Sequence, residues 1–168
     1  MPITLYIVRH AKAEDRAMFM ADFDRQLTSE GRMAAARIGR YLRGKGILPD
    51  IIISSTAVRA KDTATGVADQ IGYELARIEF DEKIYEGGPK AYLAAINALP
   101  ATTQTAMIVG HNPDVSYLAE FLTHERIGSM SKGAVIAITF DDLSWPDVSA
   151  RTGHITFQIA PKQLSSDE

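Results

Sequence analysis

The sequence predicts an α/β fold: a three-layer α/β/α sandwich with a mostly parallel central sheet. Short apolar runs rich in β-branched residues alternate with helical apolar stripes, and glycine or proline stands at many of the junctions. Strands that alternate with helices form mostly parallel sheets that are covered on both faces. With 168 residues, 46% of them apolar, the chain is long enough for one compact domain with a full core.

The first half of the chain alternates two strands with two helices. Residues 3–8 form an apolar run typical of a buried strand, and residues 51–53 form a second one. Between them, a helix begins near residues 27–30 and ends at Gly44. Residues 54–56 are cap candidates for the next helix, whose apolar stripe is Ala60, Ala64, Val67, Ala68 and Ile71.

The alternation continues in the second half. Residues 77–85 are expected to hold a strand, and Gly88-Pro89 opens a helix, since proline is favoured in the first turn. Residues 106–109 form the next strand, and Asn112-Pro113 starts the helix that follows it.

The end of the chain changes character. Residues 134–140 and 154–160 have strand patterns without a helix pattern between them, so we expect antiparallel neighbours. We predict one domain over residues 1–161, followed by a polar and frayed tail over residues 162–168.

Composition excludes several functional classes. The chain has no cysteine, which rules out disulfides, thiolate metal sites and cysteine nucleophiles. A net charge of −3 argues against a general nucleic-acid partner. The N-terminus lacks the pattern of a signal peptide, and no apolar stretch approaches the roughly 20 residues that span a bilayer. We expect a cytoplasmic protein with no membrane partner.

Candidate functional residues follow three of the expected strands. Arg9 and His10 follow the first strand, Arg59 lies in the helix after the second, and His111 follows the strand over residues 106–109. Ligands of such sheets bind beyond the carboxyl ends of the strands. If the strands are parallel, two arginines and two histidines therefore converge on one edge of the sheet.

This set of side chains is suited to phosphoryl transfer. Guanidinium groups bind phosphate oxygens through paired, charge-assisted hydrogen bonds. A neutral imidazole is a nucleophile towards phosphorus, and nearby arginines disfavour its protonation. Cationic donors stabilise the charge of the transferring group, so the chemistry needs no metal or cofactor. No two histidines have the close helical spacing of a zinc motif.

Each residue also has a plainer interpretation. Arg59 in a first helical turn could simply face solvent, and His10 or His111 alone could be structural. His124 and His154 lack comparable neighbours, and we interpret both as non-catalytic.

Three motifs in order resemble the histidine phosphatase superfamily, which has the phosphoglycerate mutase-like fold. The strand followed by Arg-His-Gly appears as Leu5-Tyr6-Ile7-Val8-Arg9-His10-Ala11, with Ala11 in place of glycine. The Ser-Pro-x-x-Arg-Ala-x-x-Thr-Ala signature appears from Ser54 to Ala64 with an altered turn, and Gly-His-Asn-Pro is intact from Gly110 to Pro113. The short chain and residues 24–28 resemble SixA-type phosphohistidine phosphatases in particular.

The resemblance implies roles for individual residues. His10 is the nucleophile, and Arg9, Arg59 and His111 hold the phosphate. Larger relatives carry a glutamate that protonates the leaving group, and Glu86 stands at about that place; a solvated loop residue is the alternative. The loss of glycine at residue 11 would cost more if the backbone there were left-handed.

The function expected from this resemblance is metal-independent hydrolysis of a phosphorylated protein, such as a histidine-phosphotransfer domain, through phosphohistidine at His10. The alternatives are a small-molecule phosphomonoesterase and a non-catalytic phosphoprotein-binding module. Lys12 and Arg25 could extend the positive edge towards a protein partner or be ordinary surface charges.

Overall fold

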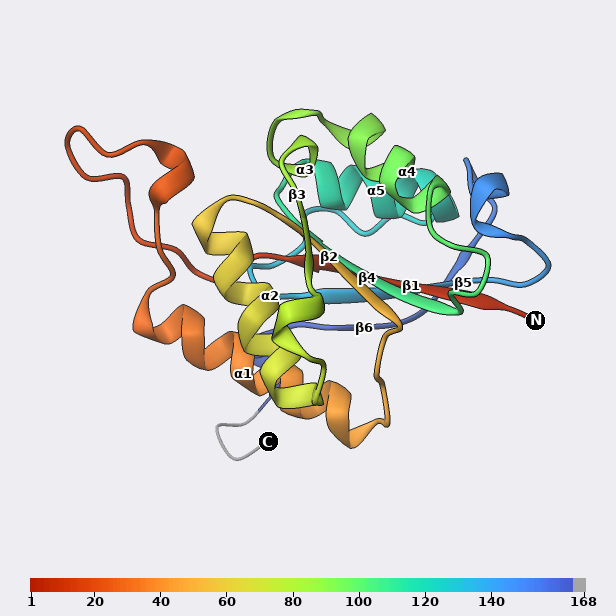
Figure 1. Cartoon of the computed structure of the whole chain (residues 1–168), viewed down its shortest axis with the longest axis horizontal. Helices are drawn as coiled ribbons and strands as arrows, with labels where there is room; N and C mark the ends of the chain where they lie inside the picture. The colour runs from red at the N-terminus through yellow and green to blue at the C-terminus, as the bar shows by residue number, and fades with distance from the viewer. Residues whose placement is uncertain (165–168) are drawn as a thin grey trace.

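A computed structural model describes residues 1–164 and places one six-stranded sheet between two layers of helices (Figure 1). The strand order is β3-β2-β4-β1-β5-β6. The first four of these strands are parallel, whereas β5 runs antiparallel to β1 and β6 antiparallel to β5. The mostly parallel sheet and its antiparallel end are both confirmed. The strands are β1 (Ile3–Arg9), β2 (Ile51–Ser55), β3 (Glu79–Asp81), β4 (Thr105–Gly110), β5 (Val135–Phe140) and β6 (His154–Ile159).

Helices cover both faces of the sheet. In Figure 1, α1 and α2 lie below the sheet, and the three other helices lie above it. The helices are α1 (Ser29–Gly44), α2 (Val58–Ile71), α3 (Lys83–Glu86), α4 (Pro89–Asn97) and α5 (Asp114–Thr123). Within residues 1–164 the chain also forms the 3-10 turns η1 (Asp22–Asp24), η2 (Leu75–Arg77), η3 (Trp145–Asp147) and, after the last strand, η4 (Pro161–Gln163).

Side chains that alternate along the strands build two cores. In β1, Leu5 and Ile7 join the core under α4 and α5, whereas Tyr6 and Val8 join the core under α1 and α2. This alternation is the ordinary consequence of a strand's two-residue repeat. Both faces are apolar because both are covered, which confirms the three-layer sandwich.

One local prediction is confirmed and another is wrong. Residues 77–85 hold the expected strand, but it is short: Glu79–Asp81 pair at the sheet edge, and Asp81 Oδ1 then accepts the backbone N–H of Lys83 as α3 begins. The polar residues before α2 do not cap it by their side chains, because Ala57 is its N-cap. The Ser55 hydroxyl accepts from the Ala57 N–H instead, at 3.1 Å, and holds the turn before the helix.

Packed structure continues past residue 161. Pro161–Gln163 form η4, and Leu164 is buried in the core under α1 and α2. The rest of the predicted tail, residues 165–168, lies outside the described residues. No helix within residues 1–164 has both the length and the apolar character required to cross a membrane.

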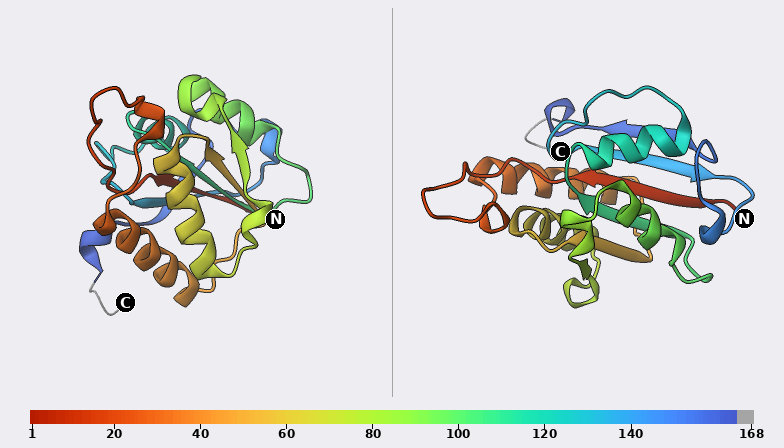
Figure 2. Two further views of the ribbon diagram at one scale, coloured as in Figure 1. Left: turned by 60° about the vertical axis from the view of Figure 1, so that its left-hand side comes forward. Right: turned by 90° about the horizontal axis from the view of Figure 1, so that it is seen from above.

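The segment between β1 and α1 projects from the carboxyl end of β1. Figures 1 and 2 show it as a long loop that extends past the ends of α1 and α2. It carries η1 and leads to Thr28, whose side chain accepts the N–H of Gly31 and so caps α1. The helix therefore begins within residues 27–30, as the sequence predicts.

Candidate active site

Two adjacent parallel strands bring the two histidines together. Arg9 of β1 stands opposite Gly110 of β4, so the next residue of each strand is a histidine at the same sheet edge. The backbone N–H of His10 donates to the Gly110 carbonyl at 3.0 Å. The ring centroids of His10 and His111 are 5.3 Å apart. The register of the sheet therefore creates the pair that the sequence only suggested.

His10 is held with one ring nitrogen free to act as a nucleophile. Its Nδ1 lies 2.7 Å from the carbonyl oxygen of Ala11. A carbonyl can only accept, so Nδ1 carries the proton and Nε2 keeps its lone pair. Burial, together with the charges of Arg59, Arg9 and Arg25, lowers the pKa of His10 to about 4. His10 is therefore neutral at physiological pH.

His111 is oriented by two partners. Its Nε2 lies 2.7 Å from the Ser55 hydroxyl, and its backbone N–H donates to the Tyr92 hydroxyl at 3.0 Å. Nδ1 is buried and has no hydrogen-bond partner in the described part of the chain. Burial, followed by the effects of His10 and Arg59, lowers the pKa of His111 to about 3. If Ser55 donates to Nε2, Nδ1 carries a proton that is available to an oxyanion.

Gly110 makes room for this arrangement. A Cβ at this position would overlap the hydroxyl of Tyr92. The glycine of the Gly-His-Asn-Pro motif therefore lets the tyrosine hydroxyl reach the backbone of His111. The absence of a Cβ thus permits a close approach of a side chain to the backbone.

Arg59 is buried rather than solvent-facing, with 6% of its surface exposed. It lies in the first turn of α2, and both of its terminal nitrogens donate to Asp22 at 2.9 Å, one to the backbone carbonyl and the other to Oδ2. Arg9 donates to the Met130 carbonyl at 2.8 Å. The Nε atoms of Arg9 and Arg59 are buried without a hydrogen-bond partner within residues 1–164. Buried donors of this kind are suited to an anion that completes the site.

Asp22 and Tyr85 are site residues that the sequence analysis missed. Tyr85 donates from its hydroxyl to Asp22 Oδ2 at 2.8 Å, and its ring lies between His111 (5.5 Å between centroids) and Arg59 (5.8 Å from the guanidinium carbon). Partial burial raises the pKa of Asp22, but hydrogen bonds from Tyr85 and Arg59 outweigh this and hold it at about 2. Asp22 is therefore ionised and holds the Arg59 guanidinium in place through a salt bridge.

Arg25 belongs to this group, whereas Lys12 pairs elsewhere. Arg25 Nε lies 3.0 Å from Asp22 Oδ1, and its charge contributes to the lowered pKa of both histidines. The three-residue spacing between Asp22 and Arg25 is compatible with an ion pair and was the signal available in the sequence. The sequence alone could not place this pair beside Arg59. Lys12 forms an exposed salt bridge with Glu30 at 2.9 Å.

Ala11 fits where relatives carry glycine. Among the described residues, only Phe19, His124 and Arg151 are non-glycine residues with positive φ, so Ala11 bears no left-handed strain. Its backbone N–H donates to the Thr63 hydroxyl at 3.0 Å. The alanine is therefore compatible with the site.

The structure does not connect Glu86 with the other candidate residues. Glu86 ends α3, is exposed, and forms no hydrogen bond or salt bridge within residues 1–164. His124 ends α5 with positive φ, and the exposed His154 lies 3.8 Å from Asp141. The described residues contain no cluster of three or more histidine, cysteine, aspartate or glutamate side chains arranged to hold a metal ion.

Sequence comparison places the chain among known proteins. Residues 5–89, about half of the chain, match the family model of the histidine phosphatase superfamily, branch 1. An uncharacterised protein of Mycobacterium leprae is 33% identical over 119 residues, which cover 69% of this chain and 71% of that protein. An uncharacterised protein of Mycobacterium tuberculosis is 30% identical over 152 residues, or 84% and 91% of the two chains.

Structural comparison agrees with the sequence. The proposed phosphohistidine phosphatase SixA of Agrobacterium tumefaciens has a TM-score of 0.82 at 26% identity and covers 96% of this chain and 99% of its own. The corresponding protein of Nakamurella multipartitia has a TM-score of 0.80 at 25% identity, with 96% and 97% covered. A protein histidine phosphatase SixA complexed with tungstate shares the fold at 22% identity, with a TM-score of 0.84 and 97% and 100% covered. This chain belongs to the histidine phosphatase superfamily.

Proposed function

We propose that this protein hydrolyses phosphohistidine on a phosphorylated protein, through a covalent phosphohistidine at His10 and without a metal ion. The observation that carries the proposal is the orientation of His10: a buried, neutral imidazole whose Nδ1–H is held by the Ala11 carbonyl. A merely structural histidine has no need of a free Nε2 near the buried Arg59 and the half-buried Arg9.

The first step transfers the phosphoryl group to the enzyme. His10 Nε2 attacks phosphorus, and the P–N bond to the substrate imidazole breaks. Arg9 and Arg59 donate to the oxygens of the transferring group, and the Nδ1–H of His111 is placed to do the same. When the other ring nitrogen of the substrate imidazole carries a proton, this leaving group departs as a neutral molecule.

The second step regenerates the enzyme. Water attacks the phosphorus of phospho-His10, the P–Nε2 bond breaks, and inorganic phosphate and a proton are released. His10 keeps its Nδ1–H throughout, because the Ala11 carbonyl holds that proton before and after transfer. The ring therefore returns to its neutral starting form.

The state of two candidate carboxyl groups, those of Asp22 and Glu86, supports phosphohistidine as substrate. An ester leaves as an alkoxide and benefits from a general acid, whose pKa must lie near the working pH. Asp22 has a pKa of about 2 and is ionised, while the exposed side chain of Glu86 forms no hydrogen bond or salt bridge within residues 1–164. The full-length similarity to proposed SixA phosphohistidine phosphatases points to the same class. The absence of cysteine supports the cytoplasm as its place of action.

A trapping experiment tests the covalent step. The protein is mixed with a histidine-phosphotransfer domain labelled with radioactive phosphate, and the reaction is quenched in alkali. We expect label on His10 that is stable to alkali and labile to acid, and none on the His10→Ala variant. The exposed His154→Ala serves as the matched control and should be labelled like the wild type.

A substrate panel tests the specificity. The wild type and His10→Ala are compared on the phosphohistidine protein, a phosphotyrosine peptide and sugar phosphates. The proposal requires the highest kcat/KM on phosphohistidine. Faster cleavage of a sugar phosphate would reassign the protein as a small-molecule phosphomonoesterase, and phosphoprotein binding without label or turnover would make it a binding module.

A further inference from the structure

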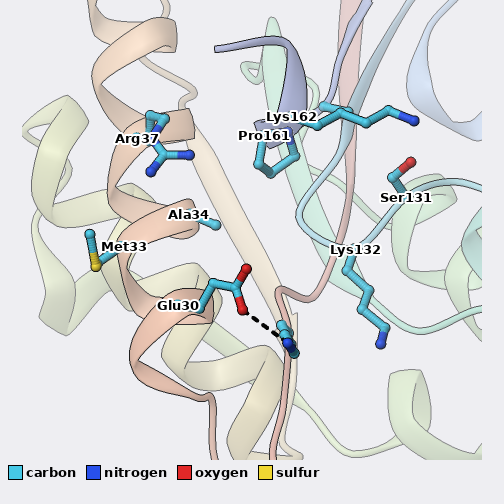
Figure 3. A pocket seen from close by; sticks show the side chains of 10 residues that line it. Glu30, Met33, Ala34, Arg37, Ser131, Lys132, Pro161 and Lys162 are labelled. Carbon is cyan, nitrogen blue, oxygen red and sulfur yellow. Dashed lines mark hydrogen bonds and ion pairs between the residues drawn. The ribbon is translucent and has the colours of Figure 1, made fainter. Parts of the chain in front are cut away.

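A groove of about 480 Å³ opens beside the active site, between α1 and η4 (Figure 3). Its α1 side includes Met33, Ala34 and Arg37, and its other side includes Lys132 and Pro161. Met33 is 60% exposed. No side chain of residues 1–164 occupies this volume.

The groove lies at the same edge of the sheet as the two histidines. Val135 begins β5 opposite Val8 near the end of β1, and it also pairs with Ile159 at the end of β6. The residues just before β5 and just after β6 therefore lie beside those that follow β1. Gly133 makes the link direct, since its N–H lies 3.0 Å from the Arg9 carbonyl and 3.1 Å from the His10 carbonyl.

The groove is positively charged, whereas the whole chain carries a net negative charge. The protein has a net charge of −3, yet the groove is lined by four cationic side chains and one acidic one. The acidic Glu30 is already paired with Lys12 at 2.9 Å. Within residues 1–164, Arg37, Lys132 and Lys162 form no salt bridge, and Arg37 Nε is buried without a hydrogen-bond partner.

The lining combines these cations with apolar groups. Ala34, Ala160 and Pro161 offer a surface that aliphatic parts of a polypeptide can cover. Unpaired lysines and arginines attract carboxylates and steer association at low salt. An extended stretch of acidic residues satisfies both features, whereas a free phosphate would use only the charges.

We propose that this groove binds an acidic segment of the phosphorylated protein while His10 takes its phosphoryl group. The inference rests on the proposed function. The groove and the histidines share one sheet edge, so a single polypeptide can reach both. The catalytic residues would act on the phosphoryl group, and the groove would select which phosphorylated protein is presented.

The test uses paired peptides and paired variants of the full chain. Each peptide carries one phosphohistidine and a flanking block of either glutamates or glutamines. Lys132→Glu/Lys162→Glu reverses two exposed groove charges, and Arg43→Glu/Lys45→Glu makes the same charge change at the far end of α1. None of these four residues belongs to the catalytic machinery, so all proteins should hydrolyse p-nitrophenyl phosphate equally.

We expect the wild type and the far-end variant to prefer the glutamate peptide by about tenfold in kcat/KM at low salt, mainly through KM. The groove variant should lose this preference, and about 1 M salt should abolish it in every protein. Equal use of both peptides by the wild type would overturn the groove inference but leave the proposed function standing.

Two other outcomes can be distinguished from the loss of peptide preference. Failure of the wild type to hydrolyse any phosphohistidine substrate would remove the proposed function and the inference with it. Sedimentation of all three proteins tests whether the groove binds a second copy of this chain. A change of oligomeric state in the groove variant alone would show that it does and would overturn the inference.

Discussion

Arg59 donates two hydrogen bonds of 2.9 Å to Asp22, one to Oδ2 and one to the backbone carbonyl. The two residues are 37 positions apart and come from the projecting loop and from α2. The carboxylate also accepts from Tyr85 and pairs with Arg25. One side chain thus fixes the arginine, the tyrosine that lies against His111, and a second positive charge.

Loss of this clamp should impair catalysis. We expect Asp22→Ala to lower kcat/KM on phosphohistidine protein by about 10- to 100-fold, because a guanidinium displaced by about 1 Å loses its alignment with the transferring group. Steady-state kinetics measures this. Asp24→Ala is the matched control, since Asp24 is an exposed neighbour in the same turn. Equal activity of both variants would mean that Arg59 does not need Asp22.

The Ser55 hydroxyl should affect catalysis by orienting His111, and not only the stability of β2. Ser55→Ala leaves His111 Nε2 and the Ala57 N–H without their partner. We expect a loss of about 1–3 kcal/mol in unfolding free energy. We also expect kcat/KM to fall at least about tenfold, because the imidazole is no longer aimed at the oxyanion. Denaturant titration and steady-state kinetics measure the two effects.

Ser54→Ala is the control for this variant. Ser54 is equally buried in β2, but its hydroxyl donates to the Ser55 carbonyl and not to a histidine. It should lose stability while keeping activity near that of the wild type. A matching loss of activity in both variants would point to general damage of the strand.

Stability should decline as the pH falls through the range in which unfolded histidines protonate. In the folded state the pKa values of His10 and His111 are about 4 and about 3, against 6.5 for an ordinary histidine. Below pH 6.5 the unfolded chain binds protons that the folded chain does not, so stability decreases from about pH 6.5 to about pH 4. We expect a loss of a few kcal/mol, measured by denaturant titration at several pH values.

His10→Gln should flatten part of this pH profile, and the exposed His154→Gln should leave it unchanged. The lowered pKa of Asp22 acts in a separate window: its contribution is present above about pH 3.8 and is lost as the pH approaches 2. A wild-type profile that is flat between pH 6.5 and 4 would contradict the buried, neutral state of both histidines.

Glu86→Gln should have little effect on phosphohistidine hydrolysis. The side chain is exposed and forms no hydrogen bond or salt bridge within residues 1–164, and the leaving imidazole can depart neutral without an added acid. We expect kcat/KM to stay within about threefold of the wild type, as for the exposed Glu82→Gln in the same segment. A fall of about 10²- to 10⁴-fold on an ester substrate would instead reveal a general acid and favour the small-molecule reading.

Local pattern was sufficient for most of the fold. The apolar runs at residues 3–8 and 106–109 and the proline at residue 89 identified β1, β4 and α4 within a residue or two. At residues 77–85 the pattern located a strand but not its bounds: Glu79–Asp81 pair at an edge, and α3 begins at Lys83. Short edge elements owe their conformation to neighbours rather than to their own periodicity.

The sequence by itself determined the layers of the fold and the four side chains that end up near one another, because a parallel sheet carries the residues that follow its strands to one edge. Only the tertiary structure decided how these side chains are held. Asp22, Tyr85 and Ser55 reach the site from a loop and from other elements, and no periodicity relates them to Arg59 or His111. Hydrogen bonds between distant segments depend on the final packing, and that packing also set the burial that keeps both histidines neutral.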